Sequence, residues 1–281
     1  MEILHTIKET RAAIAQTRRE GESVGLVPTM GCFHEGHLSL MRRARQESDL
    51  VVVSIFVNPI QFGPGEDFRE YPRDLERDAR MAREVGVDLI FNPSVEEIYP
   101  EGYRTYVEVA KLSEVLCGAS RPGHFRGVTT VVLKLLSIVQ PDKAYFGRKD
   151  YQQLKIIERM VKDLDLPIRI VEVPTVREPD GLAMSSRNTY LSPEERRAAL
   201  VSSKSLAYAQ ELLDQGITSG EELRQRVEKF ILQEPLARID YVAVVHPETL
   251  EHVVKVEGEA VLALAVRIGG TRLIDNTLLA R

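Results

Sequence analysis

The segment Pro28–His37 has the composition of a phosphate-binding turn. It reads Pro-Thr-Met-Gly-Cys-Phe-His-Glu-Gly-His and lies between a short apolar run and a helical pattern. Gly31 and Gly36 permit tight turns and a close approach of the backbone to a ligand. The start of a helix offers unpaired N–H groups and the positive end of the helix dipole, which both favour phosphate. His34 and His37 are three residues apart, so they face the same phosphate if this turn is helical.

Other sites with similar spacing fit this segment less well. The Gly-x-x-x-x-Gly spacing matches the glycines of a P-loop, but His37-Leu38 stands where that loop requires Lys and then Ser or Thr. Cys32, His34 and His37 are zinc-ligand types, yet the chain has neither a Cys-x-x-Cys pair nor a His-Glu-x-x-His helix here, which disfavours zinc. A structural turn with incidental histidines is the third interpretation, and two histidines between two glycines weigh against it.

Two later segments carry charges or hydroxyls that suit phosphate. In Gly147-Arg148-Lys149-Asp150, Lys149 is a suitable point charge, and Asp150 could hold a cation or begin a helix. Met184-Ser185-Ser186-Arg187 supplies two hydroxyls and a guanidinium group, which suit a polyphosphate. Taken alone, the first segment is more typical of a solvated loop, and the second fits a polar linker equally well.

The elements expected around these segments alternate between strand and helix. Apolar and β-branched runs predict strands at residues 24–27, 50–57, 87–91, 143–146 and 168–173, with Pro28 ending the first. Helical spacing predicts helices at residues 38–47, 75–84, 128–139 and 151–164. This alternation predicts an α/β fold with a Rossmann-like parallel sheet and helices on both faces. Ligands usually bind such sheets beyond the carboxyl ends of the strands.

The pattern changes near Val176. Ser192, Pro193 and Glu195 form a capping-box sequence that opens a helix at residues 193–214. A helix at 220–232 and strands at 239–245 and 259–267 follow. We therefore expect two domains, residues 1–176 and residues 177–281, of which the second is smaller and of the α+β class.

Composition limits the class of protein. The 281 residues are 43% hydrophobic and 28% charged, which is typical of a globular protein, and the net charge of −5 opposes non-specific binding to nucleic acid or anionic membranes. The N-terminus has no apolar signal-peptide core, and the apolar run Leu50–Val57 is too short to span a bilayer. Two cysteines make no disulfide framework. We expect a soluble, cytoplasmic protein.

The chemical segments occur in an order that resembles a known family. The His-x-Gly-His turn followed by a late Met-Ser-Ser-Arg loop is similar to the adenylate-forming nucleotidyltransferase superfamily, which includes class I aminoacyl-tRNA synthetases. More closely, the chain resembles the pantothenate synthetase (pantoate–β-alanine ligase) family. The stretches that carry this resemblance are Pro28–Leu40, Ser54–Asp67, Arg121–Gly127, Gly147–Gln153 and Val173–Leu191.

The resemblance implies a reaction and its participants. Such enzymes join (R)-pantoate to β-alanine through a pantoyl-adenylate intermediate, releasing pyrophosphate and AMP, and so make pantothenate, a precursor of coenzyme A. ATP is a substrate, Mg²⁺ accompanies its phosphates, and neither nucleic acid nor a membrane takes part. Family members are usually homodimers. The C-terminal domain is expected to close over the ATP site.

The resemblance also implies roles for residues. His37 would be the principal catalytic residue, assisted by His34, Lys149 and Arg187. Gln61 and Gln153 would bind pantoate, and Gln61 would also lie near β-alanine. ATP would contact these four catalytic residues and also Met30, Gly31, Cys32, Phe33, Glu35, Gly36, Gly147, Arg148, Asp150, Val176, Met184, Ser185 and Ser186.

Three positions qualify that assignment. His124 and Arg126 are expected to shape the site. The family commonly has an acidic residue where Arg148 stands, so the geometry beside Lys149 is expected to differ. No residue is assigned as a direct metal ligand.

Two other functions fit the same motifs. A nucleotidyltransferase that moves AMP onto a phosphorylated substrate would release pyrophosphate but never AMP. A nucleotide-binding regulator that has lost turnover would bind ATP without consuming it. The presence of His34, His37, Lys149 and Arg187 together argues against the regulator, since binding alone does not require all four.

Overall fold

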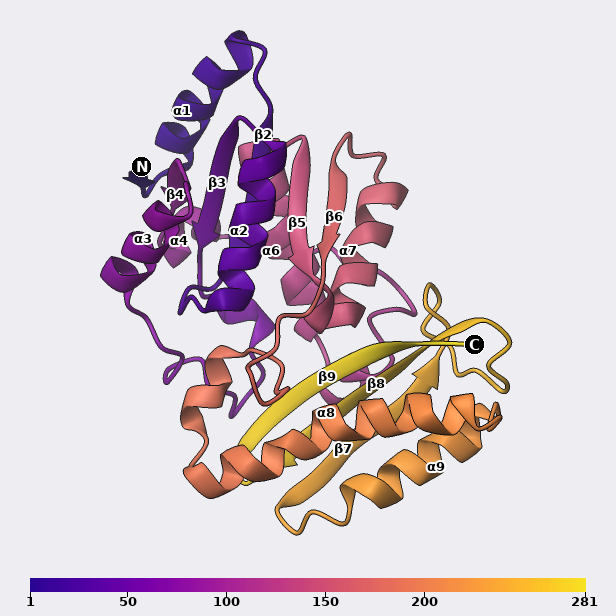
Figure 1. Cartoon of the computed structure of the whole chain (residues 1–281). Coiled ribbons are helices and arrows are strands. Elements are labelled where there is room, and N and C mark those ends of the chain that lie inside the picture. The colour runs from indigo at the N-terminus through magenta and orange to yellow at the C-terminus, as the bar shows by residue number, and fades with distance from the viewer. The chain divides into compact units, whose positions relative to one another are not determined.

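The computed structural model describes all 281 residues, Met1–Arg281 (Figure 1). The chain divides into two compact units. The first unit comprises Met1–Glu114, Arg121–Arg148 and Gln153–Pro174, and the second comprises Val115–Ser120, Lys149–Gln152 and Thr175–Arg281. Two short segments that precede Pro174 in the chain therefore belong with the C-terminal residues.

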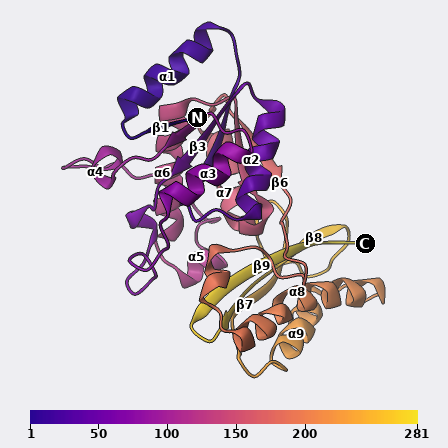
Figure 2. The ribbon, with the colours of Figure 1, turned by 60° about the vertical axis from the view of Figure 1, so that its left-hand side comes forward.

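The first unit is built on a six-stranded parallel sheet. Its strand order is β1-β4-β3-β2-β5-β6. The strands are β1 (Glu2–Leu4), β2 (Val24–Thr29), β3 (Leu50–Ile55), β4 (Leu89–Phe91), β5 (Lys143–Gly147) and β6 (Arg169–Val173). The central strands carry apolar side chains on both faces, because helices cover both (Figures 1 and 2).

Helices cover this sheet on its two sides. On one face α2 (Glu35–Glu47) packs beside α3 (Leu75–Glu84), and on the other α1 (Ile7–Arg19) packs beside α6 (His124–Val139) (Figures 1 and 2). The remaining helical elements of the chain's first 174 residues are α4 (Val95–Ile98), α5 (Cys117–Ser120), α7 (Tyr151–Asp163) and the 3-10 turns η1 (Pro59–Gln61) and η2 (Arg148–Asp150). Phe33, Met41, Val53 and Tyr145 lie in the core between α2, α3 and the sheet.

The order in which the chain adds strands to the sheet reverses direction between β2 and β5. From β2 the chain proceeds to β3 and β4 on one side, whereas β5 leads to β6 on the other. Loops that leave the carboxyl ends of two such strands diverge, which opens the usual ligand position of an α/β sheet. The strand ends Thr29, Ile55 and Gly147 lead into the segments that the sequence singles out.

The second unit contains a three-stranded antiparallel sheet in the order β7-β8-β9. Its strands are β7 (Ala237–Val245), β8 (Glu259–Ile268) and β9 (Thr271–Ala280), and helices α8 (Pro193–Asp214) and α9 (Gly220–Ile231) pack on one face of the sheet (Figure 1). Between Pro174 and α8 lies one further 3-10 turn, η3 (Ser186–Tyr190). None of the helices of the whole chain is both long and apolar enough to cross a membrane.

The predicted α/β architecture with an added α+β part is confirmed, and α3 begins and ends at the predicted residues. Several strand ends were wrong by one or two residues; for example, β3 ends at Ile55 and β4 begins at Leu89, whereas residues 50–57 and 87–91 were expected. The predicted end of β2 was also wrong, because β2 continues through Pro28 to Thr29. A proline is tolerated there because β5 pairs only with Gly25 and Leu26, so no ladder bond to β5 is lost. The sequence patterns also placed the starts of α2 and α6 too late and missed β1, α1 and β9.

The capping box at the start of α8 is present, because Ser192 Oγ accepts from Glu195 N at 3.2 Å and Glu195 Oε2 accepts from Ser192 N at 2.8 Å. We expect Ser192→Ala to lower the free energy of unfolding by about 1 kcal/mol, because one backbone N–H loses its acceptor. Urea denaturation followed by circular dichroism measures this. Ser203→Ala in the middle of the same helix is the control and should change stability much less. Equal effects of the two variants would contradict the capping role.

Candidate functional site

A buried carboxylate fixes the turn between β2 and α2. Asp78, on α3, is 1% exposed and accepts hydrogen bonds from Cys32 N and Phe33 N, both at 2.7 Å. Burial raises the pKa of Asp78 although these two bonds favour the ionised form. Gly31 has a φ of +84°, and a Cβ there would meet Asp78 Oδ2 at 2.9 Å. The turn therefore needs both the carboxylate and a glycine.

The rings of the two histidines in the turn accept hydrogen bonds from backbone N–H groups at the start of α2. His34 is the N-cap residue, and its Nδ1 accepts from Gly36 N at 3.1 Å. His37 Nδ1 accepts from His34 N at 3.4 Å, and the ring centroids lie 4.1 Å apart. Because Nδ1 accepts in both rings, each neutral imidazole carries its proton on Nε2. Both rings are thus oriented as hydrogen-bond donors through the nitrogen remote from the backbone.

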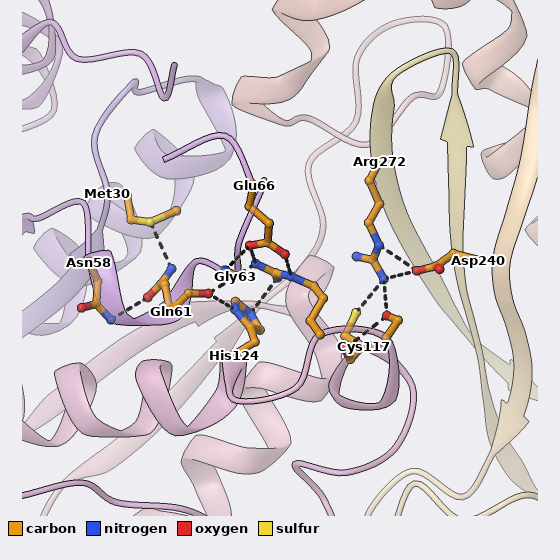
Figure 3. Close-up of polar contacts among 11 residues, drawn as sticks. Met30, Asn58, Gln61, Gly63, Glu66, Cys117, His124, Asp240 and Arg272 are labelled. Atoms are coloured by element: carbon orange, nitrogen blue, oxygen red, sulfur yellow. Dashed lines mark hydrogen bonds and ion pairs between the residues drawn. The ribbon is translucent and has the colours of Figure 1, made fainter. Parts of the chain in front are cut away.

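Gln61 lies on η1, the turn that follows β3, and contacts the β2–α2 turn. Its Nε2 donates to Met30 Sδ at 3.1 Å, and its Oε1 accepts from Asn58 Nδ2 at 3.0 Å (Figure 3). Asn58 is 1% exposed and in turn accepts from Tyr99 Oη at 2.8 Å. The amide of Gln61 is therefore held in one orientation by a buried neighbour.

An ion pair holds the backbone of the same turn. Arg121 donates to both carboxylate oxygens of Glu66 at 2.6 Å and to His124 Nε2 at 2.9 Å. Guanidinium groups only donate, so His124 accepts at Nε2 and donates from Nδ1 to Gln61 O at 2.8 Å (Figure 3). Burial would raise the pKa of Glu66, but the hydrogen bond and charge of Arg121 outweigh it and lower the pKa to about 2.

The glycine of the Arg121–Gly127 motif lets α6 approach η1. A Cβ on Gly127 would lie 2.5 Å from Ile60 O and 2.6 Å from Gln61 Cα. No side chain fits at that distance without moving the backbone of η1. Arg126, in the same motif, is exposed and stacks on the Tyr106 ring at 4.2 Å.

The segment after β5 is shared between the two units. In the first unit, Arg148 pairs with Glu172 of β6, so its charge is balanced by a carboxylate. Gly147 ends β5, and Gln153 is half-buried in the first turn of α7. In the second unit, Lys149 O accepts from Asn276 Nδ2 at 2.8 Å, and Asp150 directly precedes α7.

The Met-Ser-Ser-Arg loop is folded back on itself in the second unit. Met184 N donates to Val176 O at 3.0 Å, and Ser185 Oγ accepts from Arg187 N at 3.3 Å. Arg177, one residue after Val176, forms a bidentate ion pair with Asp275 of β9 at 2.7 and 2.9 Å. The two serines and Arg187 are half-buried.

Each unit thus gathers a subset of the predicted site residues. The first unit brings together Met30, His34, His37 and Gln61. The backbone N–H groups of Cys32 and Phe33 donate to Asp78 and so hold the turn. The second contains Lys149, Asp150, Val176 and the residues 184–187. Sequence reasoning missed the residues that hold them, namely Asn58, Glu66, Asp78, Arg121, Asp275 and Asn276.

Only some of these omissions had a sequence signal. Asn58, Glu66 and Arg121 lie inside stretches that the resemblance already marked, whereas Asp78 lies within an ordinary helical pattern. No group of three or more His, Cys, Asp or Glu side chains is arranged to hold a metal ion.

Comparison with known proteins identifies the family. The family model described as "Pantoate-beta-alanine ligase" matches residues 2–278. The chain belongs to the pantoate–β-alanine ligase family. It is 59% identical over 279 residues to a pantothenate synthetase from Moorella thermoacetica, and 60% identical over 276 residues to one from Heliobacterium modesticaldum. These alignments cover 99% and 98% of both proteins, respectively.

Solved structures of the pantoate–β-alanine ligase family share the fold. Pantothenate synthetase from Thermus thermophilus superposes with a TM-score of 0.94 at 51% identity, covering 99% of each chain. The ligase from Francisella tularensis, described as complexed with β-γ ATP and β-alanine, gives a TM-score of 0.79 at 38% identity and covers 99% of this chain and 97% of its own. The resemblance expected from the sequence is confirmed, and the nucleotidyltransferase and regulator alternatives are not favoured.

Gly127 provides a test of how α6 and η1 pack in this family member. At an open helical position Gly→Ala raises stability by about 1 kcal/mol, but at Gly127 we expect Ala to lower the free energy of unfolding by about 1–3 kcal/mol, because its Cβ would collide with η1. Urea denaturation gives the sign. Gly258→Ala, where a Cβ meets nothing within 4 Å, is the control and should leave stability nearly unchanged. Stabilisation by Gly127→Ala would contradict the close approach.

The Glu66–Arg121 pair predicts a pH dependence of stability. The pKa of Glu66 in the folded protein, about 2, is below its ordinary value of 4.5, so the pair stabilises the fold above pH 4.5 and loses this contribution as the pH falls toward 2. We expect about 1–2 kcal/mol, because the partly exposed carboxylate is screened by solvent.

Denaturation curves measured from neutral to acidic pH test this dependence. In Glu66→Gln the fall of stability with acidification should be shallower than in the wild type by that amount, whereas exposed Glu101→Gln should follow the wild type. Parallel curves for wild type and Glu66→Gln would rule out the contribution.

Proposed function

We propose that this protein catalyses the ATP-dependent ligation of (R)-pantoate and β-alanine to pantothenate. The observation that carries the proposal is the identity of 59% with a pantothenate synthetase over 99% of both chains. The Francisella relative, described as complexed with β-γ ATP and β-alanine, supports ATP and β-alanine as ligands.

The reaction has two balanced steps. A carboxylate oxygen of pantoate attacks the α-phosphorus of ATP, the bond from that phosphorus to the bridging oxygen breaks, and pyrophosphate leaves with the electron pair. The unprotonated amine of β-alanine then attacks the acyl carbon, loses a proton and expels AMP. Adenylylation is needed because a carboxylate is a poor acyl donor. Charge stabilisation and positioning supply most of the catalysis in such phosphoryl chemistry.

We assign the ATP phosphates to the β2–α2 turn and to two segments of the second unit. His34 and His37 carry their protons on Nε2, which suits donation to phosphate oxygens, and His37 would act on the departing pyrophosphate. Lys149 and Ser185-Ser186-Arg187 would hold the phosphates electrostatically. Mg²⁺ would accompany the phosphates and offset their charge.

We assign pantoate to Gln61 and Gln153, with Gln61 also near β-alanine. An amide both donates and accepts, so one glutamine can recognise a hydroxyl and a carboxylate oxygen together. The bond from Asn58 to Gln61 Oε1 supports this role because it fixes which end of the Gln61 amide donates. The His124 bond to Gln61 O supports the expectation that His124 shapes the site.

Three further statements belong to the same proposal. The second domain, residues 177–281, would close over ATP during turnover. The protein would act as a homodimer in the cytoplasm, as the family resemblance implies. Sedimentation of the purified protein measures the oligomeric state, and protease sensitivity of residues 179–187 with and without ATP and pantoate measures closure.

The function is tested by measuring pyrophosphate and AMP release from ATP, Mg²⁺ and (R)-pantoate, with and without β-alanine. We expect one burst of pyrophosphate per site without β-alanine, and continuous AMP release once it is added. Absence of pyrophosphate under both conditions would refute the proposal. Pyrophosphate release that continues without AMP would indicate a nucleotidyltransferase instead.

His37 is tested with two substitutions that separate capping from chemistry. His37→Ala removes the whole ring, whereas His37→Asn keeps an acceptor for His34 N and loses the donor at Nε2. We expect both to lower the rate of pyrophosphate formation by roughly 10²- to 10³-fold, with folding unchanged by circular dichroism. The exposed His252→Ala is the control. A near-normal rate in His37→Asn would remove the catalytic assignment and leave only the cap.

A further inference from the structure

Two adjacent residues of the last strand hold the two phosphate segments of the second unit. Asp275 and Asn276 lie in β9 and are 3% and 6% exposed. Adjacent strand residues point to opposite faces of a sheet, so the two side chains can serve different neighbours. Buried polar side chains of this kind cost free energy unless they are paired, and both have found partners outside their own strand.

Asp275 holds the start of the Met-Ser-Ser-Arg loop. Its carboxylate receives two hydrogen bonds from Arg177, at 2.7 and 2.9 Å, and Arg177 also donates to Gly181 O at 3.0 Å. Residues 177 and 183 form a β-bridge, and the Met184 N bond to Val176 O continues it. The bidentate ion pair therefore fixes the base from which Ser185, Ser186 and Arg187 extend.

Asn276 holds the backbone of Lys149. Its Nδ2 donates to Lys149 O at 2.8 Å. The bond goes to the main-chain carbonyl, so it sets the position of the residue without engaging its ammonium group.

A second connection, through residues 115–120 and Gln152, joins the segment of Lys149 to β9. Arg272, on the same face as Asn276, pairs with Asp240 at 2.7 Å (Figure 3). It also donates to Ser120 Oγ at 3.3 Å. Gln152 then links the segment of Ser120 to that of Lys149, because its Oε1 accepts from Cys117 N at 3.0 Å and its Nε2 donates to Val115 O at 2.7 Å.

We propose that Asp275 and Asn276 are positioning residues that place Ser185-Ser186-Arg187 and Lys149 in fixed register with each other for the first, adenylate-forming step. The inference rests on the proposed function, in which these segments hold the phosphates of ATP. Because the two residues are consecutive in one strand, any shift of β9 moves both segments together. Neither residue touches the reacting atoms in this scheme.

The decisive variant is Asn276→Asp, which keeps the shape of the side chain but turns an oxygen, in place of an N–H donor, toward Lys149 O. A displaced catalytic group can cost about 10²-fold, so we expect the rate of pyrophosphate formation to fall roughly 10- to 100-fold. The rate of AMP release from supplied pantoyl adenylate and β-alanine should stay within about twofold of wild type, since that step no longer involves the pyrophosphate phosphates. Thr277→Val, the next residue of β9, is the matched control.

A double-mutant cycle separates positioning from a general structural role. If Asn276 acts through Lys149, Asn276→Asp should have almost no further effect on pyrophosphate formation in a Lys149→Ala background. If the loss is the same in both backgrounds, or if AMP release from pantoyl adenylate falls equally, the inference is wrong. Should Asn276→Asp melt below the assay temperature, Asn276→Ser, which is too short to reach Lys149 O, takes its place in the cycle.

The same measurements distinguish this inference from the proposed function. Wild-type protein that releases no pyrophosphate with ATP and pantoate overturns the function itself. A wild type that is active, with Asn276→Asp equally active, overturns only the inference. A fully active Lys149→Ala overturns it as well, because Asn276 would then position a residue of no consequence. Asp275→Asn paired with Arg187→Ala repeats the cycle for the other segment.

Discussion

The β2–α2 turn depends on one requirement, that backbone N–H groups next to a helix start cannot be left without acceptors. Asp78 meets this for Cys32 and Phe33, and the two histidines meet it for Gly36 and His34. The carboxylate is placed by a different helix, so the shape of the turn is tied to the packing of α3 against α2. The same hydrogen bonds also set the histidine tautomers, because Nδ1 accepts in both rings.

Gln61, the candidate pantoate residue, is also held by hydrogen bonds from neighbouring residues, here from side chains of Asn and His. Its amide is oriented by a buried asparagine, and its backbone carbonyl is fixed by a histidine whose tautomer an arginine imposes. Gly127 keeps the helix behind it close enough for these bonds to form. In both turns the residues expected to meet ligand are shaped by neighbours that do not meet it.

The fold was largely predictable, because most elements of the first unit are apolar runs or helical patterns with clear ends. β9 was not, since Asp275-Asn276 interrupts its apolar pattern, and only their partners Arg177 and Lys149, far away in sequence, make burial of that pair favourable. β1 has only three residues, too few to show a period.

The sequence predicted the candidate ligand-binding residues of the site but not the residues that position them. Residues expected to touch ligand lie in short motifs that can be read locally. The residues that position them act over long sequence separations, as Asp78 does on Cys32, and leave no local pattern. Arg148 shows the limit clearly: its departure from the family was visible, but the balancing Glu172 on the neighbouring strand required the structure.

The long sequence separation between Lys149 and β9 has a consequence for synthesis on the ribosome. Domains generally fold as they emerge, N-terminal parts first. The Lys149 carbonyl, however, accepts from a residue 127 positions later, in a strand that follows all six strands of the parallel sheet. A nascent chain can therefore complete the parallel sheet while Lys149 is still unanchored. The bond from Asn276 to the Lys149 carbonyl can form only once β9 has emerged as well.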